Sequence, residues 1–142
     1  LRPLAGDAQV ANVHVGIDVR QPHVYFVVNS LVKMAQVIED VGLPNVYPNV
    51  DIGHLCITRE GPERLAKLRD RLIHVHLSET DTYEHTNSIL GTGKADFRAY
   101  IDKALALSGL FGRREGRLWR GRLIEADNYS CRGVWVSCEE PG

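Results

Sequence analysis

The sequence predicts an α/β fold in which parallel strands alternate with helices. Segments with the apolar spacing of a helix alternate with short strand-like segments, and most connections between them are brief, which is the pattern of βαβ units. Polar residues also recur where strands end, at Asp18, Asp51 and His76. Because parallel α/β folds gather their chemistry at the carboxyl ends of their strands, we expect a functional site there.

The N-terminal elements are a helix, a strand and a longer helix. Residues 1–8 keep helical spacing, and the alternation that follows predicts a strand over residues 13–18. Apolar residues then recur at helical intervals over residues 28–38. Asn29 or Ser30, near the start of this segment, supplies the polar side chain that begins a helix, and Gly42-Leu43-Pro44 closes it.

Two further strands follow. Residues 46–51 predict a short strand, although Pro48 cannot donate a hydrogen bond to a sheet. A helix begins at Pro62, a residue that the first turn of a helix tolerates. The third strand spans residues 72–77, and the polar segment 78–94 predicts a loop.

The C-terminal part is predicted to hold one more helix and one more strand. Asp96 caps a helix whose apolar face runs over residues 97–105 and which Gly109 ends. Residues 122–126 are the last candidate strand. Since strands joined by helical crossovers run in the same direction, four parallel strands are expected.

The composition is that of one globular domain. The chain has 142 residues, of which 44% are hydrophobic and 25% charged. A formal charge of -1 argues against a nucleic-acid-binding protein, and the arginines of residues 113–122 more often form a solvated face. No apolar stretch approaches the ~20 residues of a membrane helix, and no signal-peptide layout is present. We therefore expect a cytoplasmic protein. The widely spaced cysteines predict reduced thiols rather than disulfides or a zinc knuckle; they are Cys56, Cys131 and Cys138.

The histidines and aspartates allow two interpretations. His74 and His76 are two residues apart, so on a strand both point to one face, where an imidazole could reach a metal ion. The alternative is that both are hydrogen-bonded core residues. Asp51 and His54 also allow two interpretations, a metal site or a turn, because an aspartate near a glycine is common in turns. The segment Gly91-Thr92-Gly93 lacks the spacing of a phosphate-binding loop and predicts an ordinary loop.

Three motifs in order carry a family resemblance. They are D-x-G-H over residues 51–54, H-V-H over residues 74–76 and G-x-G-x-x-D-F over residues 91–97. This combination resembles the xylose isomerase-like TIM-barrel superfamily, which includes sugar and sugar phosphate isomerases and epimerases, inosose dehydratase and the endonuclease IV type of AP endonuclease. The resemblance implies about the C-terminal half of a (β/α)8 TIM barrel over residues 1–112. It leaves residues 113–142 as a segment without a good match that holds the last candidate strand.

The resemblance also implies a site for a divalent metal ion, Mn²⁺, Mg²⁺, Co²⁺ or Zn²⁺. The implied ligands are Asp18, Asp51, His76 and Glu125, with Glu115 in reserve for the last. Asp18 and Glu125 are also the implied catalytic acid and base, although the family usually has a glutamate where Asp18 stands. His54 and His85 are the residues implied to bind substrate.

The function implied is a metal-dependent isomerase or epimerase of a small sugar or sugar phosphate, which moves a proton through an enediolate. The alternatives are a dehydratase of the inosose type on the same scaffold and a non-catalytic barrel fragment. Endonuclease activity is disfavoured, because Tyr83-Glu84-His85 lacks the D-x-H pair of that branch. Since a complete barrel needs ~250 residues, we expect a homo-oligomer or a missing N-terminal half-barrel as partner, with a carbohydrate as substrate.

Overall fold

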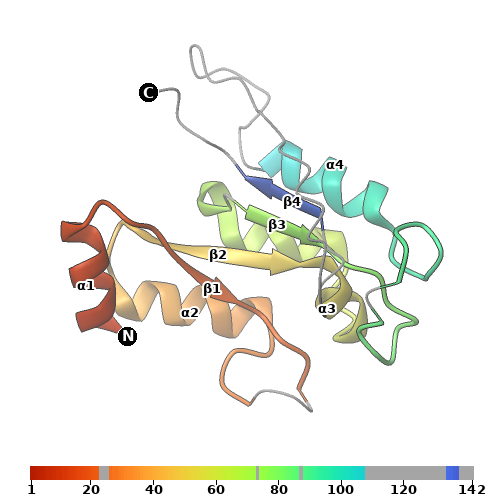
Figure 1. The fold of residues 1–142 in the computed structure, drawn as a ribbon, viewed down its shortest axis with the longest axis horizontal. Coiled ribbons are helices and arrows are strands. Elements are labelled where there is room, and N and C mark those ends of the chain that lie inside the picture. Colours follow the sequence, from red (N-terminus) through yellow and green to blue (C-terminus); the bar gives the residue numbers. More distant parts are fainter. Residues whose placement is uncertain (23–25, 73, 87, 108–133, 138–142) are drawn as a thin grey trace.

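The computed structural model shows a four-stranded sheet with helices packed on one face (Figure 1). It describes residues 1–22, 26–72, 74–86, 88–107 and 134–137. The strands lie side by side in chain order and are β1 (Val15–Asp18), β2 (Val46–Asp51), β3 (His74–Leu77) and β4 (Val134–Ser137). The helices are α1 (Arg2–Val10), α2 (Leu31–Val41), α3 (Ile52–Ile57), the 3₁₀ helix η1 (Pro62–Arg71) and α4 (Phe97–Leu107).

Three of the four strands agree with the sequence prediction, and the fourth differs. β1, β2 and β3 are parallel, as expected for strands joined by helices. β4 pairs antiparallel with β3 and lies outside every predicted strand, so the described part of the chain holds three of the four expected parallel strands. The predicted strand over residues 122–126 lies outside the described residues.

Other predictions also fall outside the described residues. They concern Gly109, the arginines of residues 113–122, Cys131 and Cys138. Cys56 is described and forms no disulfide with another described residue. No helix in the described ranges has the length and apolarity that crossing a membrane requires.

α2 shows how the sequence fixes the ends of a helix. The Ser30 hydroxyl accepts a hydrogen bond from the Lys33 N–H, which satisfies one of the free donors of the first turn. Gly42 ends the helix with φ of 69°, a left-handed conformation that glycine adopts without steric cost. The predicted helix is confirmed: it starts after Ser30, one of the two residues predicted near its start, and Gly42 closes it. η1 is also confirmed as helical, but it is a 3₁₀ helix, consistent with the three-residue spacing of Leu65 and Leu68.

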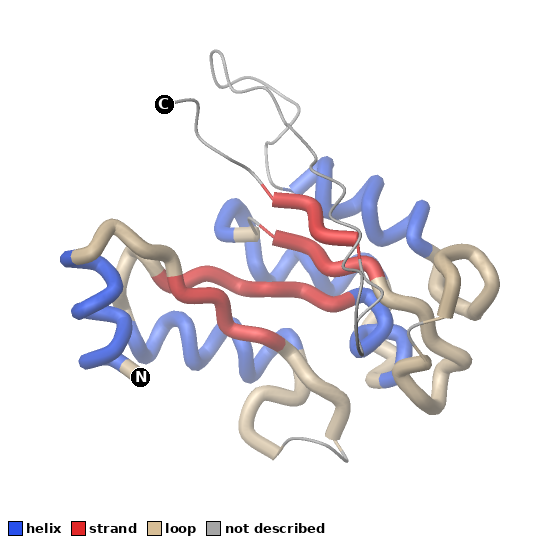
Figure 2. The backbone as a smooth tube through the Cα atoms, in the orientation of Figure 1, coloured by secondary structure: helices blue, strands red, loops and turns tan. Residues whose placement is uncertain are grey.

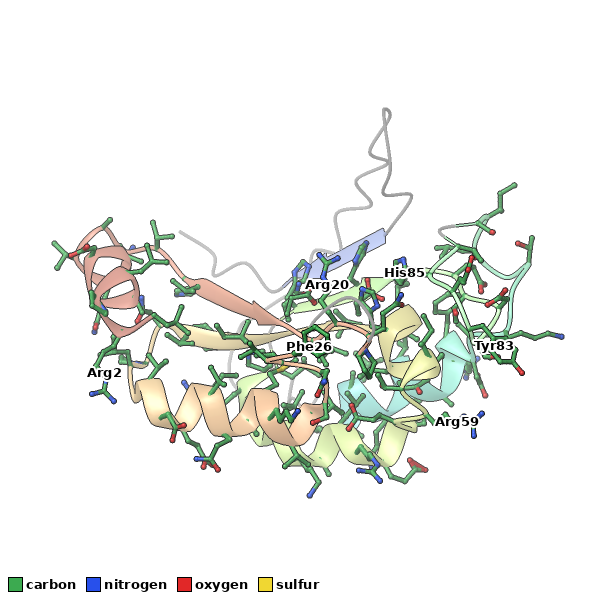
Figure 3. The ribbon with its side chains drawn as sticks, turned by 90° about the horizontal axis from the view of Figure 1, so that it is seen from below. Arg2, Arg20, Phe26, Arg59, Tyr83 and His85 are labelled. Carbon is green, nitrogen blue, oxygen red and sulfur yellow. The ribbon has the colours of Figure 1, made fainter. Side chains whose placement is uncertain are left out.

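The two faces of the sheet differ in chemistry. The register aligns Asp18 with Asn49 and His74, and Asp51 with His76, so these polar side chains share one face. The other face is apolar and is covered by α2, η1 and α4 (Figures 2 and 3). The side chains that are completely buried there include Leu31, Met34, Leu55, Val46 and Val50. The helices thus bury one face and leave the polar row on the other.

Candidate metal centre

Asp51 lies where β2 ends and α3 begins. Its backbone is extended, and its Oδ1 accepts a hydrogen bond from the His54 N–H at 3.2 Å, so the side chain caps α3. The residue is 3% exposed. The sequence did not predict α3, a helix of only 6 residues, which is too short for helical spacing to be read. This helix places His54 one turn away from Asp51.

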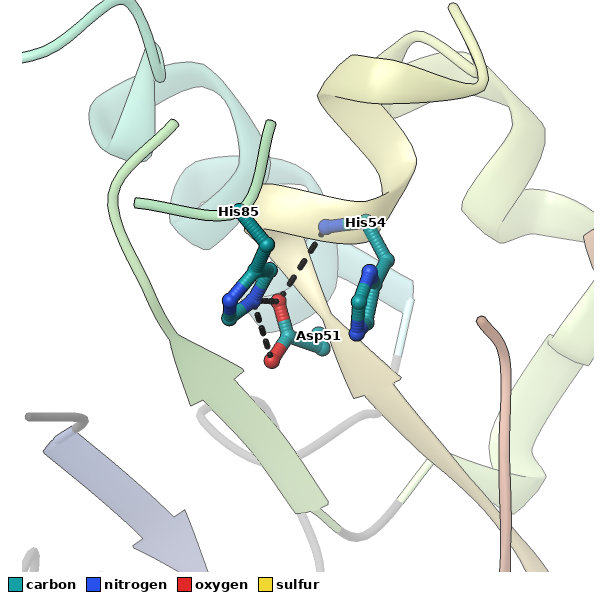
Figure 4. Close-up of side chains that lie close together, drawn as sticks. All are labelled: Asp51, His54 and His85. Atoms are coloured by element: carbon teal, nitrogen blue, oxygen red, sulfur yellow. Dashed lines mark hydrogen bonds and ion pairs between the residues drawn. The ribbon is translucent and has the colours of Figure 1, made fainter. Parts of the chain in front are cut away.

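Three side chains from β3 and the loop behind it converge on the Asp51 carboxylate. The Nδ1 atom of His76 is 2.7 Å from Oδ2. The Nε2 atom of His85 is 3.2 Å from each carboxylate oxygen (Figure 4). The Ser78 hydroxyl donates to Oδ1 and also contacts His85 Nε2 at 2.7 Å. A buried carboxylate is therefore surrounded by two imidazoles and a hydroxyl group.

His54 completes the cluster. Its ring stacks on that of His85, with centroids 4.2 Å apart and planes inclined by 27°. Its Nδ1 atom is buried and has no hydrogen-bond partner among the described residues. Asp51, His54 and His85 each offer a ligand atom, and these atoms lie within 4.8 Å of one another. Imidazole nitrogen and carboxylate oxygen are donors that Zn²⁺, Co²⁺ and Mn²⁺ accept, so the residues fit a divalent cation.

Gly53, within the D-x-G-H motif, makes the close packing possible. A Cβ atom at this position would collide with the Ser78 hydroxyl and would lie 2.9 Å from the Ser78 carbonyl oxygen and 3.0 Å from Cδ2 of His85. Only glycine lets the start of α3 approach the loop after β3 this closely. The glycine of this motif therefore allows α3 and the loop after β3 to pack against each other.

Burial and hydrogen bonding set the charges of the cluster. Burial alone would raise the pKa of Asp51, but hydrogen bonds from His76, His85 and Ser78 outweigh it and hold this pKa far below its usual range. Burial lowers the pKa of His54 to about 4, against an opposing effect of the Asp51 charge. Near neutral pH the cluster thus combines an anionic carboxylate with a neutral imidazole at His54, the forms that bind metal ions.

The structure brings together four of the residues singled out in the sequence and places the others elsewhere. Asp51, His54, His76 and His85 form the cluster. Asp18, at the end of β1, binds the Arg20 guanidinium at 2.8 Å and makes no hydrogen bond to the cluster within the described part of the chain. Its Oδ1 is buried without a described hydrogen-bond partner, and its pKa is raised, mainly by burial, with Arg20 opposing. The candidates Glu115 and Glu125 lie outside the described residues.

Two residues of the site were missed by sequence reasoning. Ser78 is two residues after His76, so the same alternation that paired His74 with His76 would have placed it on the site face. Glu79 is completely buried, and nothing in its polar sequence surroundings signals this. Its burial depends on the path of the following loop, which is a property of the tertiary structure.

Comparisons with known proteins agree with this fold. A family model described as xylose isomerase-like TIM barrel matches residues 1–109. The structure resembles D-allulose 3-epimerase from Methylomonas sp., with a TM-score of 0.64 and 25% identity over 74% of this chain and 35% of that one. It resembles an L-ribulose 3-epimerase with a TM-score of 0.66 and 25% identity over 76% of this chain and 35% of that one.

A further solved structure shares the fold. The apo form of 3-keto-D-glucoside 4-epimerase from E. coli aligns with a TM-score of 0.63 and 24% identity over 74% of this chain and 38% of that one. No curated protein matches the chain significantly. The chain spans about a third of the length of these epimerases, with 35% covered in the first two. The match over residues 1–109, together with the partial barrel, establishes that the chain belongs to the xylose isomerase-like TIM-barrel family.

Proposed function

We propose that the chain forms the metal-binding part of a sugar isomerase or epimerase, and that Asp51 is the central ligand of a divalent cation. The observation that carries this proposal is the buried Asp51 carboxylate with His76 and His85 in direct contact. A buried carboxylate surrounded by imidazoles is a common arrangement at metal centres. That the neighbouring structures include 3-epimerases of D-allulose and L-ribulose supports a ketose as substrate.

Two ligand sets are compatible with the cluster. The first, which the family resemblance favours, consists of Asp51 and His76 with Asp18 and Glu125. In it, His54 and His85 line the substrate side. The second consists of Asp51, His54 and His85, and the short separation of their ligand atoms supports it. We propose the first set, because His76 Nδ1 makes the shortest contact with Asp51 among the three imidazoles, at 2.7 Å.

The chain's own residues have distinct parts in the proposed reaction. A bound cation supplies Lewis-acid polarisation of a carbonyl and its neighbouring hydroxyl group. Asp18 takes or returns the proton at the adjacent carbon, and its buried Oδ1 is available for this because it has no described partner. Glu125 is the proposed second acid or base. The half-buried His85 and the buried His54 orient the hydroxyl groups of the substrate.

The rest of the barrel is part of the proposal. β1 is an edge strand, and a closed barrel pairs every strand on both sides. We propose that an N-terminal half-barrel or a second copy of the chain pairs with β1 in the active, cytoplasmic form. The division into a barrel part over residues 1–112 and a segment over residues 113–142, which contains β4, remains a prediction.

Titration with Co²⁺ tests the site. In isothermal titration calorimetry the Asp51→Ala variant should bind Co²⁺ more weakly by more than the roughly 10–100-fold typical of losing an outer-shell partner. The exposed Asp7 provides the matched control, Asp7→Ala, which should bind as the wild type does. Wild-type affinity in Asp51→Ala would refute the assignment.

The same titration separates the two ligand sets. His76→Ala should weaken Co²⁺ binding more than His85→Ala if the first set is correct, and less if the second is. His14, which is exposed and contacts the Tyr47 ring, gives the control His14→Ala, which should leave the affinity unchanged.

Solvent deuterium exchange tests the chemistry. With Co²⁺ and a ketose in D₂O, an isomerase or epimerase incorporates deuterium at the carbon next to the carbonyl, which NMR detects. A new ultraviolet chromophore with loss of water would instead indicate the dehydratase. Tight metal binding without exchange or product would favour a non-catalytic fragment.

A further inference from the structure

We propose that Glu79 is a positioning residue that holds the loop of residues 80–94 over Asp51 and thereby fixes His85. The importance of His85 for the reaction rests on the proposed function, whereas the holding of the loop does not. Glu79 follows Ser78 directly after β3 and is completely buried. Burying a carboxylate is costly unless hydrogen bonds replace its hydration, so its partners reveal why it is tolerated.

The partners of Glu79 are spread along the loop. Its Oε1 accepts a hydrogen bond from the Gly91 N–H at 2.6 Å, and its Oε2 accepts one from the Thr80 N–H at 3.3 Å. Its backbone carbonyl accepts from the Thr86 hydroxyl at 3.3 Å. Both ends of the loop and its middle are thus hydrogen-bonded to Glu79. Among the described residues the carboxylate makes no hydrogen bond to a helix or strand.

Further hydrogen bonds link this anchor to His85. The Lys94 N–H donates to the Thr80 carbonyl at 2.8 Å, which joins the two ends of the loop. The Thr80 hydroxyl donates to the Glu84 carbonyl at 2.7 Å, immediately before His85. His85 then reaches Asp51 at 3.2 Å, 34 residues away in sequence. Glu79 therefore acts on the cluster through the loop rather than by touching it.

Gly93 shows how tightly the loop closes on the carboxylate. A Cβ atom at this position would collide with Oε2 of Glu79 and would lie 2.7 Å from the Thr80 carbonyl oxygen. A methyl group there would push the carboxylate out of its place. Gly93→Ala is consequently a second, independent way to disturb the anchor without changing its charge.

The experiment uses the full chain without metal and compares four variants with the wild type. Glu79→Gln and Gly93→Ala disturb the anchor. Glu84→Gln removes an exposed acid from the same loop, and Gly61→Ala adds a methyl group where nothing lies within 4 Å. Amide hydrogen exchange reports the closure of the loop, and carbethoxylation of His85 followed by mass spectrometry reports its accessibility.

In Glu79→Gln and Gly93→Ala the Gly91 amide should exchange about tenfold faster or more. A hydrogen bond to a charged group protects an amide from opening by roughly this factor. His85 should react faster in both variants. The amides of β2 should keep their wild-type rates, because the anchor binds the loop and not the sheet. Both control variants should match the wild type throughout.

Two results would overturn the proposal. One is unchanged exchange at Gly91 and unchanged reactivity of His85 in both anchor variants. The other is equal acceleration at β2 and in the loop, which would make Glu79 a contributor to overall stability rather than a positioning residue. Because no metal is added, failure here is independent of whether Asp51 binds Co²⁺.

Discussion

Asp51 and Asp18 end neighbouring parallel strands, yet their surroundings differ sharply. Asp51, on β2, is 3% exposed and is contacted by side chains from β3 and the loop that follows. Asp18, on β1, has one described partner, Arg20, only two residues away in sequence. β2 has a neighbour on each side, whereas β1 is the edge of the sheet that the described strands form. The geometry of a strand-end side chain thus depends on whether both neighbouring strands are present.

The apolar surface follows the same division. We call residues 1–27 the edge region and residues 31–107 the site region. Six of the nine exposed large hydrophobic residues of the described chain lie in the edge region: Leu1, Leu4, Val10, Val13, Phe26 and Val27. Most of the fully buried core belongs to the site region. The site region therefore packs its own core, while the edge region carries most of the exposed large apolar side chains of the described chain.

Removing a core side chain of the site region should have the largest effect. Leu31 is 0% exposed at the start of α2, so Leu31→Ala should lower the free energy of unfolding by about 2–5 kcal/mol. Urea denaturation followed by circular dichroism measures the change. A loss below about 1 kcal/mol would show that α2 is not packed on the sheet in solution.

Adding a methyl group at Gly53 should have the next largest effect. The new Cβ meets Ser78 and His85, and overpacking of this kind costs about 1–3 kcal/mol. The same denaturation measurement applies, with Gly61→Ala as the control in open space. Wild-type stability in Gly53→Ala would mean that α3 and the loop after β3 are farther apart than described.

Tyr100→Phe should have a moderate effect that depends on pH. The Tyr100 hydroxyl donates to the Glu60 carbonyl at 2.7 Å, and its loss should cost about 0.5–1.5 kcal/mol. Burial raises the pKa of Tyr100, and the neighbouring Cys56 adds to this. The unfolded phenol ionises first, at about pH 10, so this contribution is full below that pH and is lost as the pH rises beyond it.

The comparison of unfolding at about pH 8 and about pH 11 tests this sign. The wild type should lose more stability over the interval than Tyr100→Phe does. Tyr83→Phe, which changes an exposed tyrosine, should follow the wild type. If Tyr100→Phe and the wild type lost the same unfolding free energy over this pH interval, the burial of the phenol would be contradicted.

A matched substitution in the edge region should have the smallest effect. Leu4 in α1 is 62% exposed, so Leu4→Ala should change the free energy of unfolding by less than about 0.5 kcal/mol. The contrast with Leu31→Ala uses the same chemical change in both regions. A loss for Leu4→Ala comparable to that for Leu31→Ala would mean that the outer face of α1 is covered in solution, as in self-association.

The sequence by itself determined most of the helices and strands and the face on which the strand histidines lie. Helical spacing predicted α2, and alternation put His74 and His76 on one face, because these periods are properties of the local backbone. The order of three motifs predicted the fold family. Local pattern gave no sign of α3, which is shorter than two turns, and did not predict β4.

Only the tertiary structure decided which residues touch. His85 contacts Asp51 from 34 positions away, and Ser78 joins both, because the loop of residues 80–94 folds back over the end of β2. That path depends on the buried Glu79 and on the space at Gly53 and Gly93, and therefore on packing between distant segments. Local periodicity carries no information about such distances, so the sequence could name candidates for the site but not its contacts.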